Sequence, residues 1–277
     1  PKCKFNPLFS CIPILLYVLI TMIKEILDNI KSLADPERAL HSQKYFKTGK
    51  GEYGAGDKFL GLKMPQIRKI ASKYKHIDLT DLESLLHNPI HEVRHCSLII
   101  LVEQYKKAAI KEERKRIYNL YLENTSYINN WDLVDTSAPH IVGKHLFDQV
   151  DKSKLFSLAQ SKDLWERRIS VLSTLFFIRK NHFDETIELC ELLLEDPEDL
   201  IHKATGWMLR EVGKRNEDIL HVFLRKHCRV MPRTMLRYAI EKLENDIRKQ
   251  YLKGEIPLIV DEVDDEDESE VEDDTDD

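Results

Sequence analysis

Three residues of this chain have the types and spacing needed to hold a cation: Trp131, Asp135 and Trp207. Trp131 and Asp135 lie four residues apart in "NNWDLVD", so on a helix they project from one face. An aromatic face and a carboxylate both attract positive charge, and a second tryptophan in "ATGWMLRE" would complete such a site. A simpler interpretation makes both tryptophans core residues, with Asn130 a helix cap and Asp135 neutralised by Arg168.

These residues belong to a helical pattern that repeats along the chain. Basic pairs recur at Arg94-His95, Arg167-Arg168 and His202-Lys203, each followed by a small and apolar run. Arg168 and Lys203 are 35 residues apart, and His95 and Arg168 are 73 apart, about twice that spacing. Such a period in helical sequence predicts an all-α solenoid of stacked hairpins, in which equivalent positions line one concave face. Asp135 falls in the slot between His95 and Arg168, so a carboxylate interrupts a predicted row of cations.

The composition agrees with a globular helical protein. Hydrophobic residues make up 42% of the 277 residues and charged residues 32%, with only nine glycines. Helix starts are indicated by Pro65, Pro197 and Pro232, since proline lacks the N–H that a first turn leaves unpaired. The segment Thr80–Glu83 predicts a capping box.

The charge of the chain is divided between a body and a tail. The net charge is −6, but residues 261–277 hold 13 acidic residues and no basic ones. The other 260 residues have 42 basic and 48 − 13 = 35 acidic residues, a balance of +7. Like charges without apolar periodicity predict disorder, so we expect an acidic tail over residues 254–277. The basic body permits a polyanionic partner.

The first 21 residues differ from the rest. No residue from Phe5 to Ile23 is charged, and Met22 precedes a good amphipathic helix. We expect residues 1–21 to lie upstream of the natural start, with a membrane anchor or signal as the alternative, and residues 22–253 to form the domain. The five cysteines lack C-x-x-C spacing, which favours a reducing compartment over a structural zinc site.

Five motifs resemble the DNA alkylation repair glycosylases of the AlkD-like type. They are "YFKTGKGEYGAGDKFLGLKMPQIRKIA" (residues 45–71), "NNWDLVD", "WERRISVLST" (165–174), "LIHKATGWMLREVGKRN" (200–216) and "MPRTMLRYAIEKL" (231–243). The resemblance implies a HEAT-like solenoid that holds duplex DNA on its concave face and removes cationic lesions such as N3-methyladenine and N7-methylguanine.

The resemblance also implies roles for individual residues. Asp135 matches the family's catalytic aspartate, and Trp131 and Trp207 match the tryptophans that flank the sugar of the lesion. Arg168 matches an arginine on the DNA backbone and Tyr45 an aromatic near the DNA; Lys203 and Arg233 are predicted as further DNA contacts. Phe176 stands where some members carry a lysine, which weakens the expectation of a phosphate contact there.

Base excision of this kind needs few catalytic groups. A base that is already cationic leaves as a neutral molecule, so no general acid is needed. One carboxylate, here Asp135, can stabilise the oxocarbenium-like sugar and orient water. The sequence therefore predicts a monomeric glycosylase without metal or cofactor, acting in the cytoplasm on the nucleoid. The alternatives are a helical-repeat DNA-binding protein without catalysis and a protein-interaction scaffold, whose DNA affinity would be weak and insensitive to salt.

Overall fold

The computed structural model describes the backbone of residues 11–255 and the side chains of residues 22–255. Most of the predicted acidic tail therefore lies outside the described residues, as do the side chains of the apolar segment 1–21. Residues 11–255 contain one isolated β-bridge, between Lys58 and Ile90, and no strand. The helices are α1 (Cys11–Ser32), α2 (Pro36–Tyr45), α3 (Met64–Lys73), α4 (Leu79–Leu86), α5 (His91–Lys107), α6 (Lys111–Glu123), α7 (Trp131–Ser137), α8 (Lys144–Phe147), α9 (Ser153–Ala159), α10 (Leu164–Ile178), α11 (Asp184–Leu192), α12 (Asp199–Gly213), α13 (Glu217–His227), α14 (Arg233–Ala239) and α15 (Asn245–Lys253), with a 3-10 turn η2 (Thr125–Tyr127) and a π-helical turn η3 (Pro139–Gly143).

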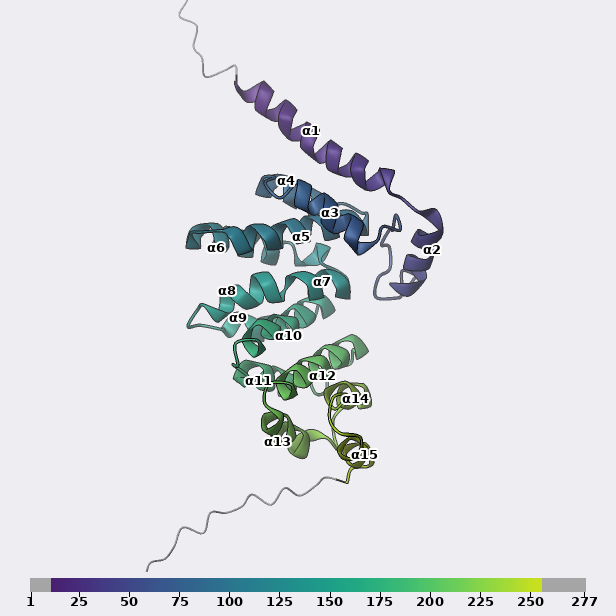
Figure 1. Cartoon of the computed structure of the whole chain (residues 1–277), viewed down its shortest axis with the longest axis vertical. Coiled ribbons are helices and arrows are strands. Elements are labelled where there is room, and N and C mark those ends of the chain that lie inside the picture. The colour runs from purple at the N-terminus through teal and green to yellow at the C-terminus, as the bar shows by residue number, and fades with distance from the viewer. Residues whose placement is uncertain (1–10, 256–277) are drawn as a thin grey trace, which may run out of the picture.

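The helices stack in chain order from α1 at one end to α15 at the other (Figure 1). Helices α3, α5, α7, α10, α12 and α14 contact one another in succession and form what we call layer A. Helices α4, α6, α8, α9, α11 and α13 pack behind them as layer B. Each helix of layer A thus closes a hairpin that contacts mainly its neighbours, and the predicted all-α solenoid is confirmed.

Helices begin at or shortly after all three predicted prolines, and the predicted capping box is the one start that disagrees. Pro197 lies two residues before α12. Pro65 occupies the first turn of α3, and Pro232 is the residue before α14. The predicted capping box is wrong, because α4 begins at Leu79 with Asp78 as its extended cap residue. Thr80 consequently lies inside the first turn, where its carbonyl accepts a hydrogen bond from Ser84. Leu79 packs partly against the core, and this packing favours a helix that begins one residue before Thr80.

The amino-terminal helix crosses the predicted domain boundary at Met22. Helix α1 extends from Cys11 to Ser32, and its residues Ile26 and Ile30 are fully buried in the core. The boundary itself stays a prediction. Among the residues that the structure describes, no helix is both long and apolar enough to cross a membrane.

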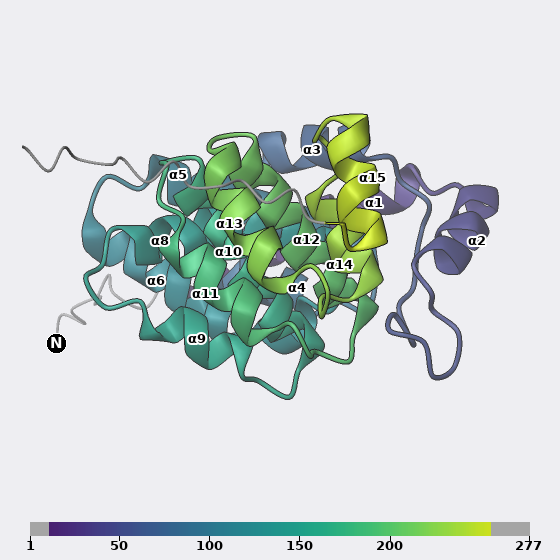
Figure 2. The same ribbon diagram turned by 90° about the horizontal axis from the view of Figure 1, so that it is seen from below.

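The connection between α2 and α3 is irregular, as its glycines predict, and is fastened to the stack at one end. The Glu92 carboxylate of α5 accepts hydrogen bonds from the backbone N–H groups of Leu60 and Gly61, at 3.0 and 2.7 Å. Gly61 has a φ of +84°, a left-handed conformation that glycine adopts without strain. Helix α2 and this connection stand to one side of the stack (Figure 2). Helix α2 and the connection therefore border the surface of layer A on one side.

A close approach of two helices positions Trp207. A Cβ atom at Gly206 would lie 2.5 Å from the carbonyl oxygen of Met235, so only glycine lets α12 and α14 pack at this distance. Trp207, the next residue, is partly buried and its indole N–H donates to Glu211 at 3.0 Å. Trp207 is therefore held at the edge of the core, with part of its surface free.

Candidate active site

One cavity of about 590 Å³ collects most of the predicted site residues. Its lining includes Tyr45, Trp131, Asp135, Arg168, Lys203 and Trp207. These residues come from α2, α7, α10 and α12, so the cavity lies where successive hairpins of layer A meet α2. Arg233 does not line this cavity. It is exposed at the start of α14 and donates to the carbonyl oxygen of Leu252 at 3.1 Å.

The carboxylate of Asp135 is paired with Arg168. Nε and Nη2 of Arg168 donate to the two carboxylate oxygens at 2.9 and 2.8 Å, and Nη1 donates to the carbonyl oxygen of Leu200 at 2.6 Å. Burial raises the pKa of Asp135, and the Arg168 charge acts in the opposite direction. Because each carboxylate oxygen has a second lone pair, the pair fixes the orientation of Asp135 and leaves room for a water molecule to donate to it.

The pairing partly confirms the interpretation that Arg168 neutralises Asp135. Asp135 is neutralised by Arg168 of the next hairpin, as that interpretation predicted, but its side chain keeps 15% exposure and lines the cavity. Arg168 itself is buried, with 6% of its side chain exposed. Its contact with a DNA phosphate stays a prediction.

The Trp131 ring is held in the cavity wall by the cap of α7 and by neighbouring aromatic rings. Asn130 caps α7 by accepting from the backbone N–H of Trp131 at 2.9 Å. The Trp131 ring stacks on Phe46, with centroids 5.2 Å apart, and meets Tyr45 edge to face at 5.9 Å. Trp131 and Trp207 thus both present partly exposed rings to a cavity that contains a carboxylate. Such an arrangement can bind a flat cationic group.

The family can now be assigned. Residues 26–243, most of the chain, match the family of DNA alkylation repair enzymes. This chain belongs to that family. A predicted DNA alkylation repair enzyme from Enterococcus faecalis has a similar structure, with a TM-score of 0.59 and 17% sequence identity over 76% of this chain and 97% of that one. At this identity the likeness supports the fold alone. No curated protein matches the sequence.

A buried ionic network connects α5 and the segment between α2 and α3 to the first turn of α7. His91, at the start of α5, lies between Asp57 and Asp132, with nitrogen–oxygen distances of 3.0 and 2.8 Å. Burial opposes protonation of His91, but the two carboxylates outweigh it and raise its pKa to about 9. The pKa of Asp132 is correspondingly lowered, since His91 and His95 offset the cost of burying its charge. His91 is therefore an imidazolium that ties α5 and the connection to the first turn of α7.

The same network corrects the predicted row of cations. Arg94 is buried and donates to the carboxylate of Asp57 at 2.5 Å, to the Asn129 side chain at 2.9 Å and to two backbone carbonyls. All of its donors point into the protein, so the prediction that Arg94 belongs to an exposed cationic stripe is wrong. Lys203 differs, because it is half-exposed at the cavity and pairs with Asp199 at 2.8 Å.

Among the residues that the structure describes, one group could share a metal ion: His91, His95 and Asp132, whose ligand atoms lie within 4.8 Å of one another. Both ring nitrogens of His91 already bond to carboxylates. A metal ion would have to replace the proton between His91 and Asp132. The prediction that the protein needs no metal was made from the sequence and stays a prediction.

Five residues that line the cavity were not predicted from the sequence: Lys44, Lys47, Tyr53, Leu200 and Tyr238. Tyr53 comes from the glycine-rich connection, where its ring meets Trp165 edge to face at 5.9 Å. Burial raises the pKa of its phenol, which is therefore neutral at physiological pH. The glycines at positions 49, 51, 54 and 56 are the signal that the sequence offers, since they favour an irregular segment between α2 and α3.

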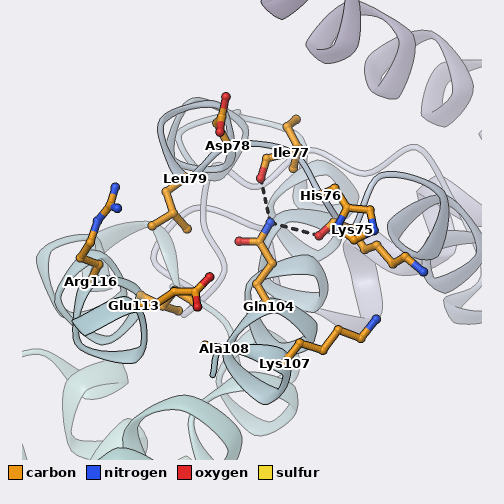
Figure 3. A pocket seen from close by; sticks show the side chains of 11 residues that line it. Lys75, His76, Ile77, Asp78, Leu79, Gln104, Lys107, Ala108, Glu113 and Arg116 are labelled. Carbon is orange, nitrogen blue, oxygen red and sulfur yellow. Dashed lines mark hydrogen bonds between the residues drawn. The ribbon is translucent and has the colours of Figure 1, made fainter. Parts of the chain in front are cut away.

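A second hollow of about 340 Å³ lies at the far end of α5 and shares no lining residue with the site (Figure 3). The Gln104 side chain at its centre donates to the carbonyl oxygens of Lys75 and Ile77, at 3.2 and 2.7 Å (Figure 3). Gln104 thus holds the turn between α3 and α4. The lining carries no Phe, Tyr or Trp side chain, so this hollow lacks the aromatic walls that the site offers to a flat cation.

Proposed function

We propose that this protein is a DNA glycosylase that hydrolyses the N-glycosidic bond of positively charged alkylated purines, of the N3-methyladenine and N7-methylguanine type, in base-excision repair. One observation carries the proposal: Asp135 lines an open cavity together with Trp131 and Trp207, and a bidentate bond from Arg168 orients its carboxylate. The partner is duplex DNA, held along the surface of layer A by a monomer that acts on the chromosome in the cytoplasm.

The chemistry follows from the charge of the lesion. Alkylation on a ring nitrogen gives the purine a formal positive charge, so the bond to deoxyribose breaks with the electron pair going to the base. The base leaves neutral, and no acid has to protonate it. Positive charge then develops on the sugar, where Asp135 stabilises it and accepts a hydrogen bond from the attacking water.

The tryptophans contribute through their faces. Their electron-rich rings stabilise the cationic base or the sugar that becomes cationic. Tyr45 beside Trp131 extends the same aromatic wall. Lys203 at the cavity supplies a charge for a flanking phosphate, a role for which the exposed Arg233 is also available.

The experiment is base release by the full chain. Duplex DNA with one N7-methylguanine is incubated with wild-type protein, with Asp135→Asn and with Asp184→Asn, a control in which an exposed carboxylate on α11 is changed. We expect free base from wild type and control only, with binding retained by all three. Binding without release, also from N3-methyladenine DNA, would support the DNA-binding protein without catalysis; weak, salt-insensitive binding would support the scaffold.

A further inference from the structure

The cavity is lined by more aromatic side chains than its two tryptophans. They are Tyr45, Tyr53, Trp131, Trp207 and Tyr238. These rings reach one cavity from five segments: α2, the connection after it, α7, α12 and α14. A purine in a duplex stacks on the neighbouring base pairs, whereas aromatic side chains can stack on a base of any sequence context. The cavity can therefore hold a purine that has no neighbouring bases.

The end of α2 and the connection are joined by a hydrogen bond beside this cavity. The backbone N–H of Gly54 donates to the carbonyl oxygen of Lys47 at 3.0 Å, and both Lys47 and Tyr53 line the cavity. Lys47 has a φ of 55°, a left-handed conformation that is unfavourable for a residue with a Cβ atom. An unfavourable backbone that is kept at a cavity indicates a role for its side chain there.

The charges of the lining favour a ligand that carries both a cation and an anion. Four lining residues are basic and one, Asp135, is acidic, a balance of 4 − 1 = 3 positive charges. The basic residues are Lys44, Lys47, Arg168 and Lys203. Asp199, outside the lining, pairs with Lys203 at 2.8 Å and reduces the excess to about two.

This excess distinguishes between kinds of ligand. A free cationic base or nucleoside would be repelled by it. One phosphate of a DNA backbone carries a single negative charge, whereas a phosphate monoester carries nearly two at neutral pH. A cationic purine nucleotide with a terminal phosphate thus matches both the carboxylate with its aromatic rings and the surplus lysines.

We propose that the cavity also accepts free purine deoxynucleoside 5′-monophosphates alkylated at N7 and hydrolyses them. The inference rests on the proposed function and extends it from DNA to the single nucleotide. The aromatic rings hold the base, Asp135 faces the sugar, and the exposed Lys44 and Lys47 bind the phosphate. A cavity of about 590 Å³ lies within the range of about 300–1,000 Å³ that small-molecule sites occupy.

Hydrolysis of such a nucleotide requires water and no other co-reactant. The water oxygen forms a bond to C1′ of the sugar while the C1′–N9 bond breaks. The electron pair of that bond goes to N9, so the cationic base leaves as a neutral molecule. Asp135 accepts the proton that the water loses and passes it to solvent. The products are the alkylated base and deoxyribose 5-phosphate.

The test measures release of N7-methylguanine by the full chain from N7-methyl-2′-deoxyguanosine 5′-monophosphate and from the nucleoside that lacks the phosphate. Spontaneous release without protein is subtracted from both. We expect kcat/KM to be at least about tenfold higher for the monophosphate, because hydrogen bonds between charged groups contribute a factor of this size. In Lys44→Gln/Lys47→Gln this preference should fall about tenfold.

A control with the same change of charge separates a contact from a long-range effect. Lys111→Gln/Lys154→Gln removes two exposed cations from α6 and α9 in layer B, and it should keep the wild-type preference. An unchanged preference in Lys44→Gln/Lys47→Gln would overturn the phosphate site. Release from methylated duplex DNA but not from the monophosphate would overturn the inference and leave the proposed function standing. Release from neither would refute the proposed function itself.

Discussion

The ion pair between Asp135 and Arg168 leads to a prediction about two variants, Asp135→Asn and the double variant Asp135→Asn/Arg168→Gln. The Arg168 nitrogens lie 2.8 and 2.9 Å from the carboxylate oxygens. A charge developing on the sugar about 4 Å from the carboxylate would lie about 8 Å from the guanidinium. With an effective dielectric of about 20, these distances give about 4 kcal/mol of attraction and about 2 kcal/mol of repulsion.

The double variant should therefore release base faster than the single variant. Asp135→Asn removes the attraction and leaves the repulsion, a loss of about 4 kcal/mol or roughly 10³-fold in rate. The double variant removes both and loses only about 2 kcal/mol, roughly 30-fold. Adding the second substitution should thus speed base release about 30-fold over Asp135→Asn alone.

The assay is single-turnover release of N7-methylguanine from duplex DNA with protein in saturating excess, so that any loss of binding by the Arg168 change does not enter the rate. Circular dichroism checks folding, since breaking a buried ion pair destabilises a protein by about 3–5 kcal/mol. A single variant within threefold of the wild type would refute the role of Asp135. A double variant slower than the single one would refute the electrostatic account of Arg168.

Three further predictions test the parts around the site. In His91→Gln, the free energy of unfolding by urea should fall by about 3 kcal/mol at pH 6, and by less at pH 10. The reason is that the folded pKa of about 9 lies above the ordinary value of 6.5, so the contribution of His91 is complete below pH 6.5 and lost as the pH rises through 9; an equal loss at both pH values would contradict the protonated network. Gly206→Ala should destabilise by about 1–3 kcal/mol and slow base release, because its Cβ would meet the backbone of Met235. The matched variant Gly213→Ala on the same helix would meet only the Leu220 side chain, which can turn aside, so thermal denaturation should show a smaller shift. Treatment with EDTA should leave base release unchanged, and inhibition that zinc reverses would instead assign a metal to His91, His95 and Asp132.

The residues that face the cavity could be predicted largely because they share a repeat position. Asp135, Arg168 and Lys203 recur at the hairpin spacing, and the structure brings all three to one cavity with Trp131 and Trp207. The same spacing led to a wrong prediction for Arg94. Periodicity indicates which face of a helix a residue occupies, but it does not indicate which residue that side chain contacts. Its partner Asp57 lies 37 residues away in an irregular connection. No local pattern shows that this connection folds back on α5.

Tyr53 and Tyr238 were missed for a related reason. Both reach the cavity from segments whose paths are set by tertiary contacts: the connection fastened by Glu92, and α14 pressed against Gly206. The capping box failed because the packing of Leu79 outweighs the preference of Thr80 for a cap position.

The site spans several helices of layer A, so its width depends on how those helices are spaced. Trp131 belongs to α7 and Trp207 to α12, and α10 is the helix of layer A between them. The gap between the two rings is thus the sum of two helix-to-helix spacings, and no covalent or sheet-like link fixes it. Bending the solenoid by a small angle at each hairpin would open or narrow that gap, and the Arg168 bonds to Asp135 on α7 and to the Leu200 carbonyl on α12 would resist the change. The stiffness of the stack, more than the rotamer of either tryptophan, would then decide how large an alkylated base can be accommodated.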